Sequence, residues 1–134
     1  MYTYHVRRSS ANQQYYWTLE AGNSEPIAWS GETYINKTDC LNGLNLFKTH
    51  APTAPVNDTT ATSARRTSTL EFELFKDVKG EYRWRFQAGN NRIIGVSGEG
   101  YITRQGCLDA IGRVKANAGR APIVDHTQTV ATLY

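Results

Sequence analysis

Residues 15–35 read YYWTLEAGNSEPIAWSGETYI, and residues 82–102 read YRWRFQAGNNRIIGVSGEGYI. At a shift of 67 positions the chain aligns with itself without a gap from 15–60 to 82–127, and 19 of the 46 aligned pairs are identical. Chance does not produce this level of identity. The sequence therefore predicts two copies of one structural unit.

Each copy begins with three predicted strands. In the second copy these are Glu71–Lys76, 81–88 and 92–97, separated by turns that contain Gly80 and Gly89. The middle strand alternates apolar with polar residues, which is typical of an antiparallel strand with one buried face. The first strand of the first copy matches only at a shift of 68, so its hairpin should contain one extra residue. The side chains predicted to face inward in the second copy are Tyr82, Trp84, Phe86, Ala88, Ile94 and Val96.

A helix follows the third strand, with Asn36 as the N-cap in the first copy and Thr103 in the second. Apolar residues recur at i, i+1, i+4 and i+7, which gives one stripe on a helix of about 13 residues. Glycines and asparagines lower the helix propensity, so packing against the sheet has to stabilise both helices. The stripes comprise Cys40, Leu41, Leu44 and Phe47 in the first copy and Cys107, Leu108, Ile111 and Val114 in the second.

The predicted organisation is a first repeat at 1–60, a polar linker at 61–69, a second repeat at 70–127 and a C-terminal tail at 128–134. A unit of about 60 residues buries too little surface to be secure alone. We therefore expect the two repeats to share one core and form a single compact domain.

The second copy closely resembles the YegP-like family, a group of small bacterial and archaeal proteins without an established activity. The first copy departs from the pattern, because Tyr16, Thr18 and Thr33 replace Arg83, Arg85 and Gly100. The resemblance implies an α+β fold of tandem β-β-β-α-β repeats. These repeats would form one antiparallel-rich sheet, with exchanged C-terminal strands and two helices on one face. The residues that carry the resemblance are Phe72, Lys76, Asp77, Gly80, Arg83, Trp84, Arg85, Asn90, Ile94, Ser97, Gly98, Glu99, Gly100, Tyr101, Val114 and Lys115.

Charge and cysteine content restrict the class of protein. The formal net charge is +3, and neither half carries the strongly basic patch expected of a dedicated nucleic-acid binder. The sequence has no apolar stretch of about 20 residues that could span a membrane, and the N-terminus lacks the apolar run of a signal peptide. Two cysteines are too few for a disulfide scaffold, so a cytoplasmic location with reduced thiols is expected.

No catalytic, cofactor or metal motif stands out. His5, His50 and His126 occur singly and at no ligand spacing, so we expect ordinary surface or strand histidines. Cys40 and Cys107 each lie in the first turn of a helix, where a thiolate could be activated. Both are in phase with the apolar stripe, which favours burial.

The repeated Ser-Gly-Glu-x-x-Tyr motif between the third strand and the helix is the first candidate binding site. Its glutamates could bind a cationic group, and backbone N–H groups at the helix start could bind an anion. Alternatively, the glycines form a bend and the tyrosines lean on the core. The candidate residues are Ser30, Gly31, Glu32, Tyr34, Ser97, Gly98, Glu99 and Tyr101.

The open sheet face is the second candidate. Tyr16, Arg83 and Arg85 are predicted to point outward, and a basic, aromatic sheet can stack single-stranded nucleic acid. Glu73 is expected to stand opposite Arg85 and neutralise it, which favours a solvated face. The sequence thus predicts a small non-enzymatic binding module whose partner, a protein or a small ligand, is unknown. Weak single-stranded nucleic-acid binding is the alternative.

Overall fold

The computed structural model describes residues 1–60 and 69–128. Most of the predicted linker and tail, at 61–68 and 129–134, lies outside the described residues. The first repeat contributes β1 (Thr3–Arg8), β2 (Tyr15–Glu20), β3 (Pro26–Trp29), α1 (Lys37–His50), the short 3-10 helix η1 (Ala51–Thr53) and β4 (Val56–Asp58). The second contributes β5 (Glu71–Lys76), β6 (Tyr82–Gln87), β7 (Ile93–Ser97), α2 (Arg104–Asn117) and β8 (Ile123–Asp125).

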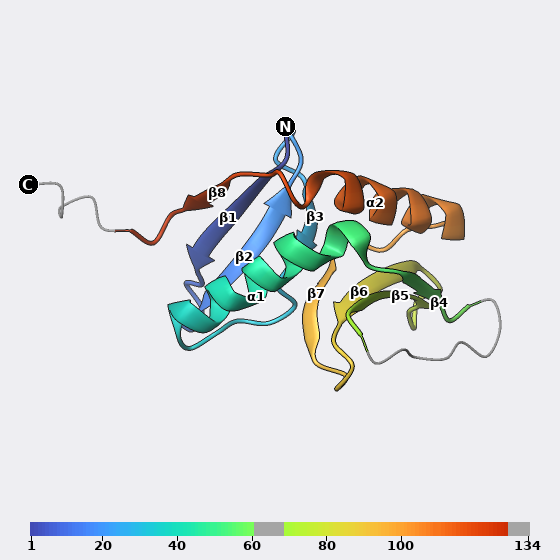
Figure 1. Cartoon of the computed structure of the whole chain (residues 1–134), viewed down its shortest axis with the longest axis horizontal. Helices are drawn as coiled ribbons and strands as arrows, with labels where there is room; N and C mark the ends of the chain where they lie inside the picture. The colour runs from blue at the N-terminus through green and yellow to red at the C-terminus, as the bar shows by residue number, and fades with distance from the viewer. Residues whose placement is uncertain (61–68, 129–134) are drawn as a thin grey trace, which may run out of the picture.

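The strands form one eight-stranded sheet in the order β4-β5-β6-β7-β3-β2-β1-β8. The last strand of each repeat pairs in parallel with the first strand of the other, β4 with β5 and β8 with β1, whereas the remaining pairs are antiparallel. Both helices lie on one face of the sheet (Figure 1). The predicted α+β fold with exchanged strands is therefore confirmed.

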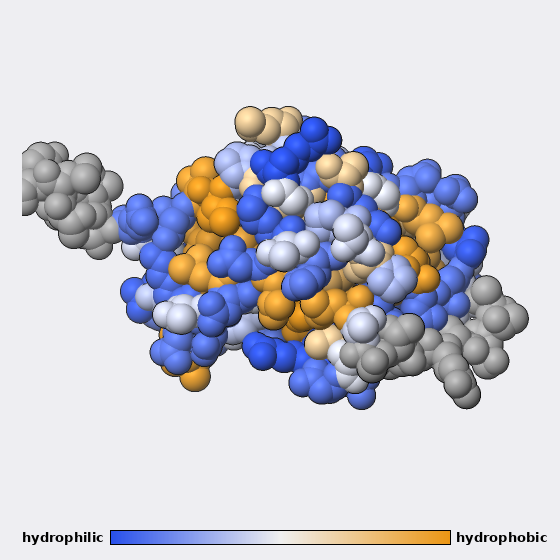
Figure 2. Space-filling model, viewed as in Figure 1, coloured by the Kyte–Doolittle hydropathy of each residue, from blue (hydrophilic) through white to orange (hydrophobic). Residues whose placement is uncertain are grey.

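An internal twofold axis relates the repeats where β3 pairs with β7. Trp29 pairs with Val96 at this junction, and the two residues occupy equivalent positions in the two repeats. The helix-covered face shows hydrophilic residues on the outer sides of the helices, with hydrophobic residues beneath and between them (Figure 2). We call the opposite, helix-free side of the sheet the outer face.

One predicted orientation is wrong. Val96 pairs with Arg85 and therefore points to the outer face, not into the core. The cause is a register shift at the end of β6, which lets both Ile94 and Gly95 turn toward the helices. A Cβ added at Gly95 would lie 3.1 Å from the indole ring of Trp17, so this strand approaches the core too closely for a larger residue.

The helices begin where predicted. The Thr103 hydroxyl accepts a hydrogen bond from the Gly106 N–H at 2.9 Å and caps α2. Asn36 occupies the equivalent position of α1, but its side chain makes no capping hydrogen bond. Lys37 and Arg104 place a positive charge in the first turn, where the helix dipole disfavours it. A nearby carboxylate is therefore needed to offset this unfavourable interaction.

Each helix holds the exchanged strand of the other repeat. Lys37 forms an ion pair with Asp125 of β8 at 2.6 Å, and Arg104 pairs with Asp58 of β4. At the other end of α2, Lys115 Nζ donates to the carbonyl oxygen of Ala54 at 2.7 Å. Because equivalent residues make these ion pairs in both repeats, we call them the two clasps.

The core is shared between the repeats and centres on Phe47 of α1. Its ring lies 4.9 Å from Trp17 of its own repeat, and 5.3 Å from Phe86 and 6.2 Å from Trp84 of the other. All four side chains are fully buried. Neither sheet half can complete its apolar interior without this helix.

We predict that Phe47→Ala lowers the free energy of unfolding by about 3–5 kcal/mol, the range for deleting a buried aromatic ring. Because the Phe47 ring contacts both repeats, the two repeats should unfold in a single transition. Chemical denaturation followed by fluorescence and by circular dichroism measures this. Val114→Ala, at the equivalent position of α2, removes fewer atoms and serves as the control with a smaller loss. Separate transitions for the two repeats would contradict the shared core.

We further predict that Asp58→Asn/Asp125→Asn removes roughly 1–2 kcal/mol near neutral pH, about the range for two partly exposed ion pairs. Burial acts to raise the pKa of both carboxyls, but hydrogen bonds from Thr60 or Thr127 and the paired cation hold it below its ordinary value. This stabilisation is present above the unfolded pKa and is lost as the pH falls through the lower folded pKa.

The difference between wild type and this double variant should therefore shrink as the pH falls below the ordinary pKa of an aspartate, as measured by urea unfolding over a pH series. Asp39→Asn, at an exposed position in the first turn of α1, is the control. A difference that stays constant from neutral to strongly acidic pH would argue against ionised clasps.

Candidate functional site

The serines of the two Ser-Gly-Glu turns are structural. Ser30 and Ser97 are buried, and each hydroxyl accepts a hydrogen bond at 3.4 Å from a backbone N–H, that of Trp17 or Trp84 respectively. The Ser30 hydroxyl also donates to the carbonyl oxygen of Glu32 at 2.7 Å. These hydroxyls tie each turn to the neighbouring strand and are not free to bind a ligand.

The glycines and tyrosines of the turns also have structural roles. Gly31 adopts a φ of 78°, a conformation that favours glycine, and a Cβ added at Gly98 would lie 2.1 Å from the carbonyl oxygen of Pro26. Tyr34 is buried, and Tyr101 is half-buried. The conformation of the turns and the burial of the tyrosines thus account for much of the repetition of the motif without a ligand.

The glutamates of the two turns do not form one site. The turns leave the ends of β3 and β7, and these strands run antiparallel, so Glu32 and Glu99 lie at opposite ends of the junction. Both glutamates are exposed. Each turn therefore has to be considered with the residues that the other repeat places beside it.

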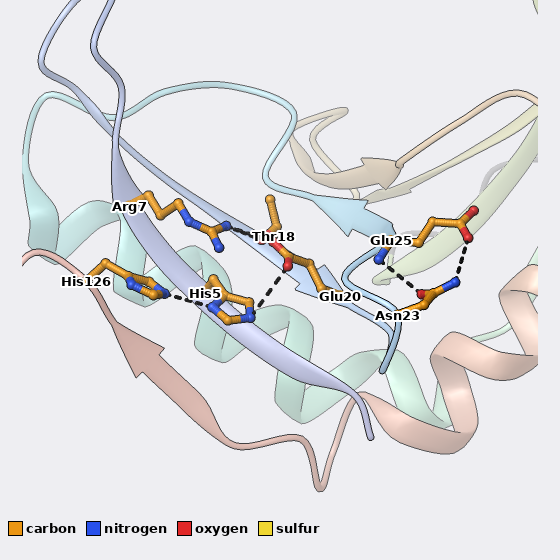
Figure 3. A network of polar contacts seen from close by, with 7 residues as sticks. All are labelled: His5, Arg7, Thr18, Glu20, Asn23, Glu25 and His126. Atoms are coloured by element: carbon orange, nitrogen blue, oxygen red, sulfur yellow. Dashed lines mark hydrogen bonds and ion pairs between the residues drawn. The ribbon is translucent and has the colours of Figure 1, made fainter.

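Glu99 faces a second carboxyl group, Glu25, across the repeat junction. The two line a depression of about 300 Å³ together with Tyr101 and Arg113. A hydrogen bond to Glu25 is the main reason that the pKa of Glu99 is raised, and the same bond lowers the pKa of Glu25. Asn23 also donates to Glu25, at 3.2 Å (Figure 3). These opposite directions favour a protonated Glu99 that is hydrogen-bonded to an ionised Glu25.

The equivalent place in the other half of the molecule has complementary charges. Arg92 occupies the position equivalent to Glu25 and lies close to Tyr34. Burial and the Glu32 charge raise the pKa of Tyr34 to about 12, whereas Arg92 opposes this increase. Turns of the same sequence thus have different electrostatic surroundings.

Arg7, Arg83 and Arg85 lie on the outer face, and each is paired with a carboxylate of its own repeat. Arg7 pairs with Glu20 at 2.7 Å and Arg83 with Asp77 at 2.8 Å. Arg85 pairs with Glu73 at 2.6 Å, as the sequence predicted, and its guanidinium lies 4.0 Å from the centroid of the Phe75 ring. The positive charge expected to attract nucleic acid is therefore neutralised locally.

Tyr16 does not lie beside Arg83 and Arg85, because β7 and β3 separate β2 from β6. Tyr16 lines a different feature, a depression of about 440 Å³ on the outer face. We call this feature the outer-face depression. The residues that line it are Ser9, Ser10, Tyr16, Thr18, Pro26, Trp29, Thr33 and Gly98.

Trp29 is the functional candidate that sequence reasoning missed. It is only partly buried on β3, and it stands where the second repeat has Val96. The difference between these equivalent positions was the available signal. The pairing of β3 with β7 brings Trp29 beside the second turn and thereby into the depression. This pairing could not be predicted from the sequence of one repeat alone.

Cys40 and Cys107 are fully buried on the helix stripes. Burial is the main reason that the pKa of each thiol is raised to about 12. Both thiols are therefore protonated near neutral pH, and the expectation of buried, apolar cysteines is confirmed.

The structure joins two histidines that the sequence showed as isolated. His5 Nδ1 and His126 Nε2 lie 2.8 Å apart, across 121 positions of the chain. His5 Nε2 also lies 3.6 Å from Glu20 Oε1 (Figure 3). Burial chiefly lowers the pKa of His5, with Glu20 opposing the shift and Arg7 and His126 reinforcing it.

Residues 1–60 and 69–128 contain neither a metal-binding cluster nor a membrane-spanning helix. No group of three or more His, Cys, Asp and Glu side chains there could hold a metal ion. No helix in this part of the chain is long and apolar enough to cross a membrane.

Comparison with known proteins identifies the family. The family model described as a domain of unknown function (DUF1508) matches twice, at residues 10–58 and 77–125. The chain therefore belongs to this family, as a tandem repeat, and the predicted family resemblance is confirmed.

Relatives and solved structures agree with this assignment. The chain is 46% identical over 54 residues to the UPF0339 protein NMB1088 of Neisseria meningitidis serogroup B, an alignment that covers 40% of this chain and 95% of the relative. It is 46% identical over 63 residues to the UPF0339 protein Atu5359 of Agrobacterium fabrum, covering 47% of this chain and 97% of the relative.

The solution NMR structure of yegP from E. coli, a protein of unknown function, superposes with a TM-score of 0.72 at 26% identity. The superposition covers 96% of this chain and 95% of yegP. The family thus establishes the fold and the duplication, and its biochemical function is unknown.

We predict that Glu25→Gln returns the pKa of Glu99 toward the ordinary range of a glutamate, because the variant removes the ionised carboxylate to which protonated Glu99 is hydrogen-bonded. An NMR titration of the Glu99 side-chain carboxyl carbon measures this directly. Arg92→Gln, the same change at the equivalent position, should leave the Glu99 titration as in wild type. An unchanged pKa of Glu99 in Glu25→Gln would show that the two carboxyls do not interact in this way.

Proposed function

We propose that this chain is a small non-enzymatic binding module and that the outer-face depression holds its ligand. The observation that carries the proposal is the placement of two aromatic rings, Tyr16 and Trp29, in one depression on a sheet face that no helix covers. Aromatic rings with nearby polar groups are the usual lining of small-molecule sites. A volume of about 440 Å³ is within the range of such sites.

The lining indicates what kind of ligand fits. Hydroxyl groups from Ser9, Ser10, Thr18 and Thr33 line the depression together with the rings. The hydroxyls of Thr18 and Thr33 already donate to Glu20 and Gln14, so they could only accept from a ligand, whereas the serine hydroxyls could also donate. The nearest charges on these strands, Arg7 and Glu20, pair with one another. A neutral ligand with a flat apolar face and polar edges therefore suits the depression better than a charged one.

The Ser-Gly-Glu-x-x-Tyr residues enter this proposal in part. Gly98 of the second turn and Thr33 of the first both line the depression, so the turns form its walls. Glu32 and Glu99 are exposed and remain our proposed polar contacts for a ligand or partner protein that extends beyond it.

The proposal of a non-enzymatic role is supported by how potential nucleophiles are used. The thiols of Cys40 and Cys107 are buried and protonated, and a thiol attacks as its thiolate. The Ser30 and Ser97 hydroxyls bind backbone groups. A cytoplasmic location, where both thiols would stay reduced, belongs to the same proposal.

Weak single-stranded nucleic-acid binding through Tyr16, Arg83 and Arg85 remains the alternative prediction. The separation of Tyr16 from the arginines and the ion pairs of Arg83 and Arg85 work against it. Such binding would have to weaken as salt increases, because it depends on contacts with phosphates.

A fragment screen by NMR tests the preferred proposal. We predict that neutral aromatic or ring-shaped fragments perturb the signals of Tyr16 and Trp29. The substitution Trp29→Ala should lower the affinity for these fragments by about tenfold or more, since stacking contributes roughly 1–3 kcal/mol to binding. Among the three tryptophans, Trp17 and Trp84 are fully buried, so ligand-induced quenching of fluorescence should report mainly on Trp29.

Two further variants make the test specific. Tyr16→Ala should lower the affinity for the same fragments. Arg83→Ala, at the equivalent position of the second repeat, should bind them like wild type because Arg83 does not line the depression. Fragments that bind Trp29→Ala and wild type equally, or that map elsewhere, would rule out the outer-face depression as the binding site.

A further inference from the structure

We propose that His5 and His126 together bind one divalent transition-metal ion at the edge of the sheet. His5 lies on β1 of the first repeat, and His126 directly follows the exchanged strand β8 of the second. Their facing nitrogen atoms, Nδ1 and Nε2, lie 2.8 Å apart (Figure 3). An ion bound by both rings would join the two repeats where β8 meets β1.

Glu20 prepares His5 to be a ligand. Its carboxylate lies 3.6 Å from His5 Nε2, which favours the proton on that nitrogen and leaves the lone pair on Nδ1 facing His126. Histidines that bind metal ions usually have such a carboxylate or carbonyl partner on the other ring nitrogen. Glu20 is itself fixed by Arg7 at 2.7 Å and by the Thr18 hydroxyl at 2.8 Å.

The proton arrangement permits binding without a charged imidazole. In the contact between neutral rings, His126 donates its Nε2 proton to the lone pair on His5 Nδ1. Metal binding requires the other tautomer of His126, with its proton on Nδ1, which exchange with solvent allows because the residue is exposed. Both lone pairs are then available to the ion.

The spacing suits a tetragonal ion. Two nitrogens about 2.0–2.1 Å from one ion lie roughly 2.9 Å apart at a right angle and roughly 3.3 Å apart at the tetrahedral angle. The observed separation of 2.8 Å between His5 and His126 is close to the first value. In the hydrogen bond the two nitrogens are directed at each other, so the exposed His126 ring has to rotate before both lone pairs can be directed at one ion. Copper(II) and nickel(II) prefer this geometry.

The site would occur once in the chain. At the other edge of the sheet Glu73 and Thr59 occupy the positions of His5 and His126, so only one edge carries the pair. Water would complete the coordination, since the protein supplies two ligands. The buried Cys40 and Cys107 do not compete for the ion.

Calorimetric titration of the full chain with Ni²⁺ or Cu²⁺ tests the proposal. We expect one saturable site in wild type and at least about tenfold weaker binding in His126→Ala. His50→Ala removes the remaining histidine, which is exposed near the end of α1, and should bind like wild type. Paramagnetic Cu²⁺ should broaden the ring signals of His5 and His126 before those of His50.

Thermal unfolding provides a second measurement. Because the ion binds the folded chain across two repeats, saturating Ni²⁺ should raise the Tm of wild type and of His50→Ala but not of His126→Ala. His126 is exposed, so its loss should not prevent folding. Equal binding by His50→Ala and His126→Ala, no saturable binding below about 1 mM, or broadening that begins at His50 would overturn the proposal.

Discussion

The structure depends on the exchange of the last strand between the two repeats. The backbone N–H of Tyr4 donates to the carbonyl oxygen of Pro122, and that of Phe72 donates to the carbonyl oxygen of Pro55, so the first strand of each repeat begins its pairing on residues of the other repeat. The aromatic core has the same dependence, since Phe47 packs against rings from both halves. The helices, which have weak intrinsic propensity, are stabilised by this shared interior.

Much of this architecture could be predicted because repetition makes the pattern visible twice. The apolar stripe with Cys40 and Cys107 and the pairing of Glu73 with Arg85 follow from periodicities of 3.6 and 2. The orientation of Val96 could not be predicted, because the register shift between β6 and β7 leaves no signal in the alternation of apolar and polar residues. The meeting of His5 with His126 could not be predicted either. Strand exchange was expected, but the choice of ring nitrogens that face each other depends on side-chain rotamers.

The two repeats agree where they build the fold and differ where they face solvent. The clasps use Asp58 and Asp125 at equivalent positions. The outer-face depression, by contrast, contains Tyr16 and Trp29, for which the second repeat has Arg83 and Val96. The repeats also differ at the junction of β3 and β7, where the first repeat has Glu25 and the second has Arg92 at the equivalent position. A binding function that needed two equal sites would have preserved these positions.

Duplication within one chain makes this asymmetry possible. The curated relatives from Neisseria and Agrobacterium align over nearly their whole length with 54 and 63 residues of this chain, so each is shorter than the 67-residue repeat period. In a chain with a single repeat, the same strand exchange would require two identical copies, and the residues at the twofold axis would have to be the same. Joining the copies removes that constraint. Trp29 can then face Val96, and His5 can meet His126 at one edge only, while the equivalent clasps keep both halves folded.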